Sequence, residues 1–153
     1  MRQAIEKIMS EVTDECVITS CGYISREVYR AKDRDRNFYC QSAMGSTLAI
    51  GLGLAYSRKD LEVIVINGDG SALMSAGTIV LYQALALWNI KHYILNNGCY
   101  ASTGGQQTCF FGTEWEGYWR THIIKVGQHS DAPRIPLQCS EITRRFKNAI
   151  RKT

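Results

Sequence analysis

Two short polar segments of the sequence could together hold a metal ion. The first is Asn-Gly-Asp-Gly-Ser at residues 67–71, and the second is Asn-Asn-Gly-Cys-Tyr at residues 96–100. Asp69 offers a carboxylate and Asn97 an amide oxygen. With one backbone carbonyl, these oxygens would form part of a ligand shell of the kind that Mg²⁺ prefers, with the remaining positions left to water and phosphate. The two segments therefore predict a metal site that also binds a phosphorylated ligand.

Each polar segment follows an apolar run that is expected to be a strand. These runs cover residues 62–66 and 92–95, and a helix-compatible stretch at 72–87 separates them. Apolar strands that alternate with helices indicate a parallel sheet covered on both faces. Neighbouring strands lie about 5 Å apart, and open α/β sheets bind ligands at the carboxyl ends of their strands. Gly70 and Ser71 begin the following helix, so their amides can face a diphosphate.

The rest of the chain fits the same fold. Further strands are expected at residues 16–19, 38–40 and 123–126, and helices at 3–10, 25–32, 44–56 and 140–150. Ser25 is expected to cap its helix. Glycine costs a helix about 1 kcal/mol relative to alanine, so the glycines of residues 44–56 predict close packing against backbone or ligand. The predicted class is α/β, with residues 1–153 forming one three-layer domain around a mostly parallel sheet.

Composition restricts the range of partners. Lys and Arg total 18 against 14 Asp and Glu, and part of the excess lies near the C-terminus, in what we interpret as a solvated helix face: Arg144, Arg145, Lys147, Arg151 and Lys152. No nucleic-acid motif accompanies these charges, so no nucleic-acid partner is expected. The six cysteines form no CxxC pair or zinc spacing, which favours reduced thiols in a cytoplasmic protein. No apolar run reaches the roughly 20 residues that span a bilayer, so no membrane partner is expected.

The two polar segments also resemble a known motif. Gly-Asp-Gly at residues 68–70 and Asn-Asn at residues 96–97 bound a segment of 30 residues that is similar to the motif of thiamine-diphosphate-dependent enzymes. The resemblance implies the thiamine-diphosphate-binding fold, with thiamine diphosphate and Mg²⁺ as cofactors. It also implies that Asp69, the Asn97 side chain and the Cys99 carbonyl bind the metal, which bridges to the cofactor's diphosphate.

Two further matches extend this resemblance. In Ser-Ala-Met-Gly at residues 42–45, Met44 resembles the apolar residue that holds the cofactor in its bent shape, and the Ser42 carbonyl would accept a bond from the aminopyrimidine. Residues 102–106 (Ser-Thr-Gly-Gly-Gln), with GYISREVY at 22–29, resemble phosphonopyruvate and sulfopyruvate decarboxylases. Together with the residues themselves, the resemblance gives as candidate cofactor-binding residues Ser42, Met44, Gly68, Gly70, Ser71 and Tyr100. The candidate substrate-side residues are Ser102, Thr103 and Gln106, followed by Arg134 and by His129, which we interpret first as a solvated loop residue.

The family's activating glutamate has no counterpart in this sequence. The glutamates lie at residues 6, 11, 15, 27, 62, 114, 116 and 141, none of them in the family's pyrimidine-binding setting. The resemblance therefore implies a β-type subunit of a 2-oxo acid decarboxylase that is completed by a separate α-type subunit, as an α2β2 assembly. Ser46 and Gln107 depart from the decarboxylase pattern and leave the particular 2-oxo acid open.

Three alternatives remain at this point. The same cofactor serves split carboligases of the acetolactate synthase type, and a Thr-Gly-Gly-Gln loop also occurs in β subunits of 2-oxo acid:ferredoxin oxidoreductases. A catalytically silent cofactor-binding subunit, or an unrelated nucleotide binder, belongs to a different class. The pair Gly51 and Gly53 lacks the third glycine and the preceding apolar strand of a dinucleotide fingerprint, so a dinucleotide site is poorly supported.

Overall fold

Five parallel strands form the centre of the molecule. The structure is a computed structural model, and it describes all residues except 111–114, 116, 152 and 153. The strands are β1 (Cys16–Thr19), β2 (Asn37–Tyr39), β3 (Val63–Gly68), β4 (Ile90–Asn96) and β5 (Thr121–Lys125), in the order β2-β1-β3-β4-β5. The predicted α/β class is confirmed, and every pair of neighbouring strands is parallel.

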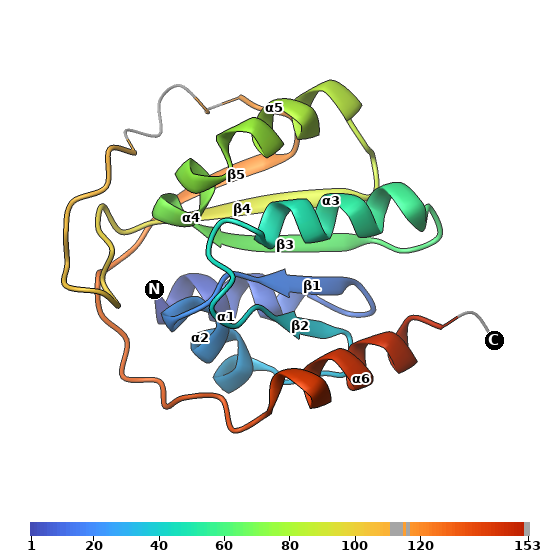
Figure 1. The fold of residues 1–153 in the computed structure, drawn as a ribbon, viewed down its shortest axis with the longest axis horizontal. Coiled ribbons are helices and arrows are strands. Elements are labelled where there is room, and N and C mark those ends of the chain that lie inside the picture. The colour runs from blue at the N-terminus through green and yellow to red at the C-terminus, as the bar shows by residue number, and fades with distance from the viewer. Residues whose placement is uncertain (111–114, 116, 152–153) are drawn as a thin grey trace.

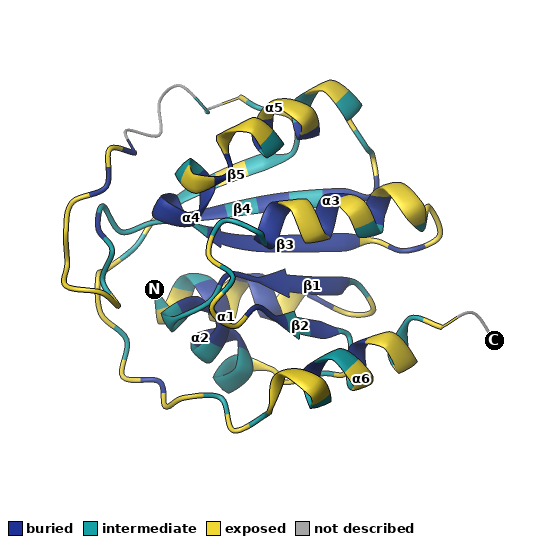
Figure 2. Cartoon of the chain, in the orientation of Figure 1, coloured by how far each residue is buried: buried dark blue, intermediate teal, exposed yellow. Residues whose placement is uncertain are grey.

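Helices cover both faces of this sheet and give the three predicted layers (Figure 1). They are α1 (Arg2–Glu11), α2 (Tyr23–Ala31), α3 (Thr47–Ser57), α4 (Asp69–Met74), α5 (Ala76–Leu85) and α6 (Cys139–Ala149). Alternate residues of β3 enter different cores: Val63 and Val65 pack on the side of α3 and α5, and Ile64 and Ile66 pack on the side of α1 and α2. Both faces of β3 are therefore buried, as the apolar run at residues 62–66 predicts (Figure 2).

Three local predictions were wrong. Residues 72–87 do not form one helix, because the chain leaves helical geometry at Ser75, between α4 and α5. Ser25 does not cap α2, which begins at Tyr23; its buried hydroxyl instead donates to the carbonyl oxygen of Ser20 at 2.6 Å. Arg145 does not belong to a solvated face, since its guanidinium pairs with Asp33 and Asp35 at 2.9 and 2.7 Å.

One helical glycine packs closely, as its sequence context predicts. A Cβ on Gly51 would lie 2.3 Å from Cγ2 of Val65, so only glycine lets α3 approach β3 this closely. Gly53 differs, because a Cβ there would meet nothing within 4 Å. Close approach thus explains Gly51 and not Gly53. No helix among the described residues is long and apolar enough to cross a membrane.

His92 should make the fold sensitive to mild acid. Its imidazole is fully buried in β4, and burial lowers its pKa from 6.5 to about 3. Between about pH 3 and pH 6.5, His92 is therefore neutral in the folded state and protonated in the unfolded state. The folded state keeps its full stability above pH 6.5 and loses stability as the pH falls below that value. We expect the free energy of unfolding to drop by about 2 kcal/mol between pH 6.5 and pH 5, at about 1.4 kcal/mol per unit.

Denaturant titrations across this pH range measure the effect. His92→Leu, which keeps an apolar side chain in the core, should remove most of the slope. His129→Leu is the matched control, because it removes an exposed histidine and leaves His92 in place. An unchanged slope in His92→Leu would exclude His92 as its source.

Candidate functional site

Asp69 is fixed at the carboxyl end of β3. It begins α4 directly after Gly68 and is only 3% exposed. One of its carboxylate oxygens, Oδ2, accepts hydrogen bonds from the Gly98 amide at 3.1 Å and the Thr108 hydroxyl at 2.6 Å. The other oxygen accepts no hydrogen bond from a described residue. Asp69 also lines a small cavity, so it offers this cavity an oriented carboxylate oxygen.

Asn97 lies beside Asp69 at the end of the neighbouring strand. Gly68 pairs with Leu95 in the sheet, which places the residues that follow β3 and β4 side by side. Asn97 lines the same cavity, and its Oδ1 accepts a bond from the Cys99 amide at 3.1 Å. An amide oxygen has two lone pairs, so the second one remains available for a metal. Among the described residues, none donates to the Cys99 carbonyl, which leaves that oxygen available as well.

Close packing leaves no room for larger side chains on the floor of this cavity. A Cβ on Gly70 would lie 2.3 Å from Cε1 of Tyr100. On the other side, the amide of Gly45 donates to the Ser71 hydroxyl at 3.1 Å and ties the segment that carries Met44 to α4. Met44, which is 39% exposed, also lines the cavity. The 44–45 segment, α4 and Tyr100 therefore enclose one space, although they lie far apart in the sequence.

The structure brings together most of the site residues that the sequence predicts. The predicted residues that line this cavity are Met44, Gly68, Asp69, Gly70, Ser71, Asn97, Cys99, Tyr100, Ser102 and Thr103. Ser42 and Gln106 do not line it. Ser42 and Arg134 line an adjacent polar cavity, and Gln106 is exposed, with its side chain beside Gly104. His129 is an exposed loop residue.

Two parts of the site were missed by sequence reasoning. The turn between β1 and α2 contributes Ser20 and Cys21 to the cavity, and α2 contributes its first residue, Tyr23. This turn could have been found, because β1 is the strand that neighbours β3 and its carboxyl end must reach the same edge. Thr108, which orients Asp69, gives no such signal, since 39 residues separate the two and only the folded loop joins them.

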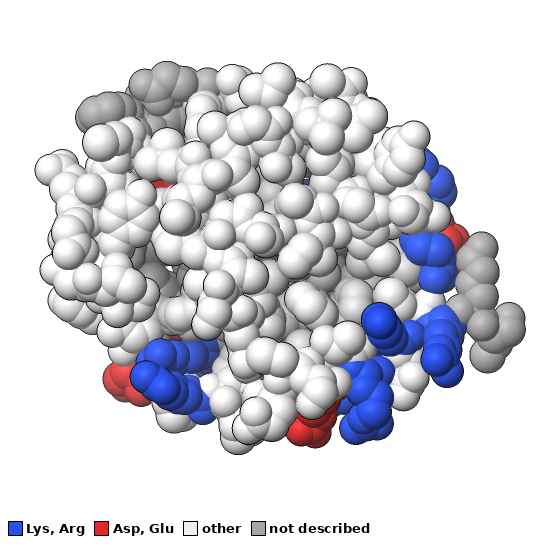
Figure 3. Space-filling view, viewed as in Figure 1, with Lys and Arg blue, Asp and Glu red and all other residues white. Residues whose placement is uncertain are grey.

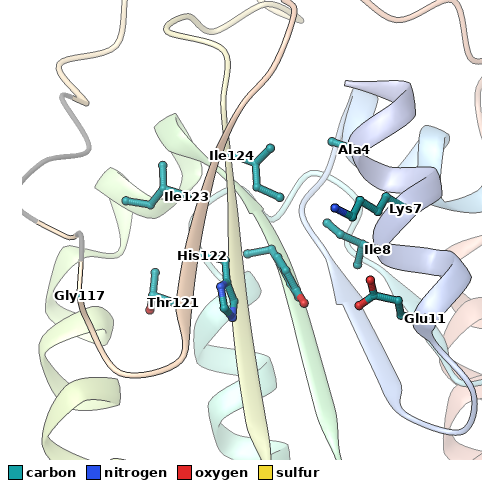
Figure 4. Close-up of a pocket in the computed structure, with 10 residues that line it drawn as sticks. Ala4, Lys7, Ile8, Glu11, Gly117, Thr121, His122, Ile123 and Ile124 are labelled. Carbon is teal, nitrogen blue, oxygen red and sulfur yellow. The ribbon is translucent and has the colours of Figure 1, made fainter.

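A wider cavity of about 670 Å³ lies elsewhere, between α1 and the outer strands β4 and β5. Figure 4 shows Lys7 and Glu11 of α1 opposite His122 of β5, whose ring stacks on Tyr93 at 5.0 Å. None of the sequence-predicted site residues lines this cavity. It also faces strand interiors rather than strand ends, so we do not assign it to the cofactor.

The small cavity has the features of a phosphate and metal site. Its volume is about 70 Å³. A cavity needs about 10–15 Å³ to hold one water molecule. This cavity therefore suits a diphosphate-sized group rather than a whole large cofactor. Oxygen donors at the carboxyl ends of adjacent parallel strands, above a glycine-lined floor, are typical of α/β proteins that bind phosphorylated cofactors.

Comparison with known proteins defines the family. Residues 19–153 match the family described as thiamine pyrophosphate enzyme, C-terminal TPP binding domain. The chain belongs to this family. The fold and the cofactor class that the sequence motif implies are thereby confirmed.

Individual relatives carry decarboxylase names. The chain is 44% identical over 106 residues to the sulfopyruvate decarboxylase subunit beta of Methanothermobacter thermautotrophicus, which covers 69% of this chain and 57% of the relative. It is 42% identical over 106 residues to the phosphonopyruvate decarboxylase of Streptomyces viridochromogenes, covering 69% of this chain and 26% of the relative. It is 44% identical over 151 residues to the sulfopyruvate decarboxylase subunit beta of Methanocaldococcus jannaschii, covering 95% of this chain and 74% of the relative. The chain thus spans little more than half of the first relative and about a quarter of the second.

Proposed function

We propose that this chain is the diphosphate-binding, β-type half of a two-subunit, thiamine-diphosphate- and Mg²⁺-dependent 2-oxo acid decarboxylase. The observation that carries the proposal is the buried Asp69 carboxylate, which lines a cavity together with Asn97; Gly98 and Thr108 hold one of its oxygens, and no described residue donates to the other. The decarboxylase names of the relatives supply the reaction class. A cytoplasmic location is part of the proposal, and the six free thiols are typical of reducing compartments.

In this proposal the chain's residues bind and orient the cofactor. Asp69, Asn97 and the Cys99 carbonyl would hold Mg²⁺, which would offset the charge of the diphosphate, and Gly70 would leave room for the cofactor beside the backbone. Met44 would contact the cofactor, and Ser102 and Thr103 would line the substrate side. When bound, thiamine diphosphate supplies a nucleophilic carbon and an electron sink for the loss of CO₂.

The proposed α-type subunit would supply the glutamate that activates the cofactor. None of the six described glutamates lines the cavity of Asp69, and Glu114 and Glu116 lie outside the described residues. Glu27 is buried, but its carboxylate is already bound by Arg30 and Ser130. The names of the relatives, which include the words subunit beta, support a separate partner, and we propose an α2β2 assembly.

The surface also supports an assembly. Exposed apolar side chains on or near α4 and α5 include Met74, Val80, Leu81, Trp88 and Trp119. Neither α3 nor α5 contains a charged residue. Figure 3 shows that the face carrying these helices is almost free of charged side chains, which gather at its margins. Extended apolar surfaces of this kind mark protein–protein contacts.

A mixing experiment tests the proposed function. The chain and its co-purified α-type partner are assayed, separately and together, for CO₂ release from sulfopyruvate, phosphonopyruvate and pyruvate. We expect release only from the mixture, with thiamine diphosphate and Mg²⁺ present. Full activity of the chain alone would refute the split site, and hydroxyketone or acyl-CoA products would assign the carboligase or oxidoreductase alternative instead.

A further inference from the structure

A second cavity adjoins the cofactor site, at the carboxyl ends of β1 and β2. It has a volume of about 420 Å³ and is lined by the turn after β1, by residues 40–42 and by residues 134–138. Cys21 lines both this cavity and that of Asp69. Ligands of open α/β sheets bind along this edge, so the two cavities are neighbouring parts of one binding region.

The described residues that line this cavity give it a positive charge, and none of them is acidic. Arg26 and Arg134 both line it, and among the described residues neither guanidinium forms an ion pair or donates a hydrogen bond. Other arginines do have partners, for example Arg30 with Asp131 at 2.6 Å and Arg58 with Asp60 at 2.6 Å. The cavity therefore holds two guanidinium groups whose donors remain available for an anion.

Arg26 is held at the boundary between the two cavities. Its guanidinium carbon lies 5.3 Å from the centre of the Tyr23 ring, and Tyr23 lines the cofactor cavity. Stacking on an aromatic ring orients a guanidinium without using its donors. Arg26 can thus reach a group that extends from the cofactor site.

Arg134 is held by a segment that is fixed on both sides. On one side, Arg30 pairs with Asp131, and the Ser130 hydroxyl donates to the buried carboxylate of Glu27. On the other side, the Gln41 amide donates to the Leu137 carbonyl at 3.1 Å. These contacts account for the burial of Glu27, which lies in α2 and is only 2% exposed. Its carboxylate binds the segment that carries Arg134.

We propose that this cavity binds the second anionic group of the substrate, a sulfonate or phosphonate, through Arg26 and Arg134. The inference rests on the proposed function and adds the residues that select the substrate. Guanidinium groups match the geometry of such oxyanions and bind them in bidentate fashion. In a three-carbon 2-oxo acid the second acidic group lies only a few bonds from the keto carbon, so its binding site must lie near the reactive part of the cofactor, beyond the small cavity that is assigned to the diphosphate. The nearby thiols would not repel the anion, because burial raises the pKa of Cys21 and raises that of Cys40 to about 11.

The test compares acids with and without the second charge. In the assembled complex, Arg26→Gln and Arg134→Gln should each raise KM for sulfopyruvate or phosphonopyruvate about 10- to 100-fold, the loss expected for a charged hydrogen bond. KM for pyruvate should change less than about threefold, and so should kcat for sulfopyruvate, phosphonopyruvate and pyruvate. Arg144→Gln is the matched control, because Arg144 is exposed on α6 and lines neither cavity. The proposal would be overturned if the two substitutions raised KM equally for pyruvate, sulfopyruvate and phosphonopyruvate, or raised KM for none of them.

A binding measurement separates this inference from the proposed function. By calorimetry, sulfolactate should bind the complex more tightly than lactate, and Arg26→Gln should abolish the difference even if no substrate is decarboxylated. Equal affinity for sulfolactate and lactate in the parent complex would refute the site. Arg26-dependent binding of inorganic sulfate without a preference for sulfolactate would identify a free-anion site and overturn its role in substrate selection.

Discussion

Replacing Asp69 by Ala should lower the affinity for thiamine diphosphate by more than about 100-fold. This change removes the only carboxylate that the described residues contribute to the cofactor cavity, and even residues that merely support metal ligands contribute about 10- to 100-fold to affinity. The affinity for thiamine diphosphate should also depend less on the Mg²⁺ concentration than it does in the parent. Calorimetric titration of the assembled complex with thiamine diphosphate, at fixed Mg²⁺, measures it.

Two companion variants separate binding from folding. Asp69→Ala leaves the buried Thr108 hydroxyl without its acceptor, while the Gly98 amide keeps Asn96 Oδ1, and the lost bond should cost about 1–3 kcal/mol of stability. Asp69→Asn keeps an acceptor oxygen and removes the charge, so it should fold normally and still bind poorly. Cys99→Ala is the matched control, because only the backbone carbonyl of Cys99 is assigned to the metal. Parent-like affinity in Asp69→Asn, or a large loss in Cys99→Ala, would contradict the assigned ligands.

Gly70→Ala should have the second largest effect. Its new Cβ would lie 2.3 Å from the Tyr100 ring, well inside van der Waals contact, so Tyr100 and the loop behind it must move. Overpacking of this kind costs about 1–3 kcal/mol. We expect a corresponding fall in the unfolding midpoint and at least a tenfold loss of cofactor affinity, since Tyr100 also lines the cofactor cavity.

A second substitution tests the cause of this loss. Gly70→Ala combined with Tyr100→Ala removes the clashing ring and should recover most of the stability. Gly53→Ala is the control. Gly53 also lies in a helix with several small residues, but a Cβ there would meet no atom within 4 Å. Failure of the double variant to recover would mean that Gly70 is required for another reason.

The strands, and the meeting of polar residues at one edge of the sheet, were predictable for a common physical reason. Apolar runs bounded by polar turns identify buried strands, and polar residues that follow neighbouring strands must meet at one edge of the sheet. The amino-acid sequence is therefore sufficient to pair Asp69 with Asn97. Ser71 lines the same cavity, and its hydroxyl accepts a bond from the Gly45 amide; its role in binding the cofactor stays a prediction.

Features that depend on tertiary packing could not be predicted. Nothing in the sequence indicates that Thr108 reaches Asp69, because the contact is made by an irregular loop. The break between α4 and α5 at Ser75 was missed, because no Pro or Gly stands at that residue. Gln106 was assigned to the site by resemblance, whereas the structure leaves its side chain exposed. Loop geometry is set by contacts that a linear pattern does not contain.

The metal position is the most direct test of the proposed site. Crystals of the assembled complex grown with thiamine diphosphate and Mn²⁺ in place of Mg²⁺ would locate the ion by anomalous scattering. We predict one peak within about 2.0–2.3 Å of a carboxylate oxygen of Asp69, the Asn97 amide oxygen and the Cys99 carbonyl. A cofactor-bound ion held by other residues, with Asp69 turned away from it, would contradict the site.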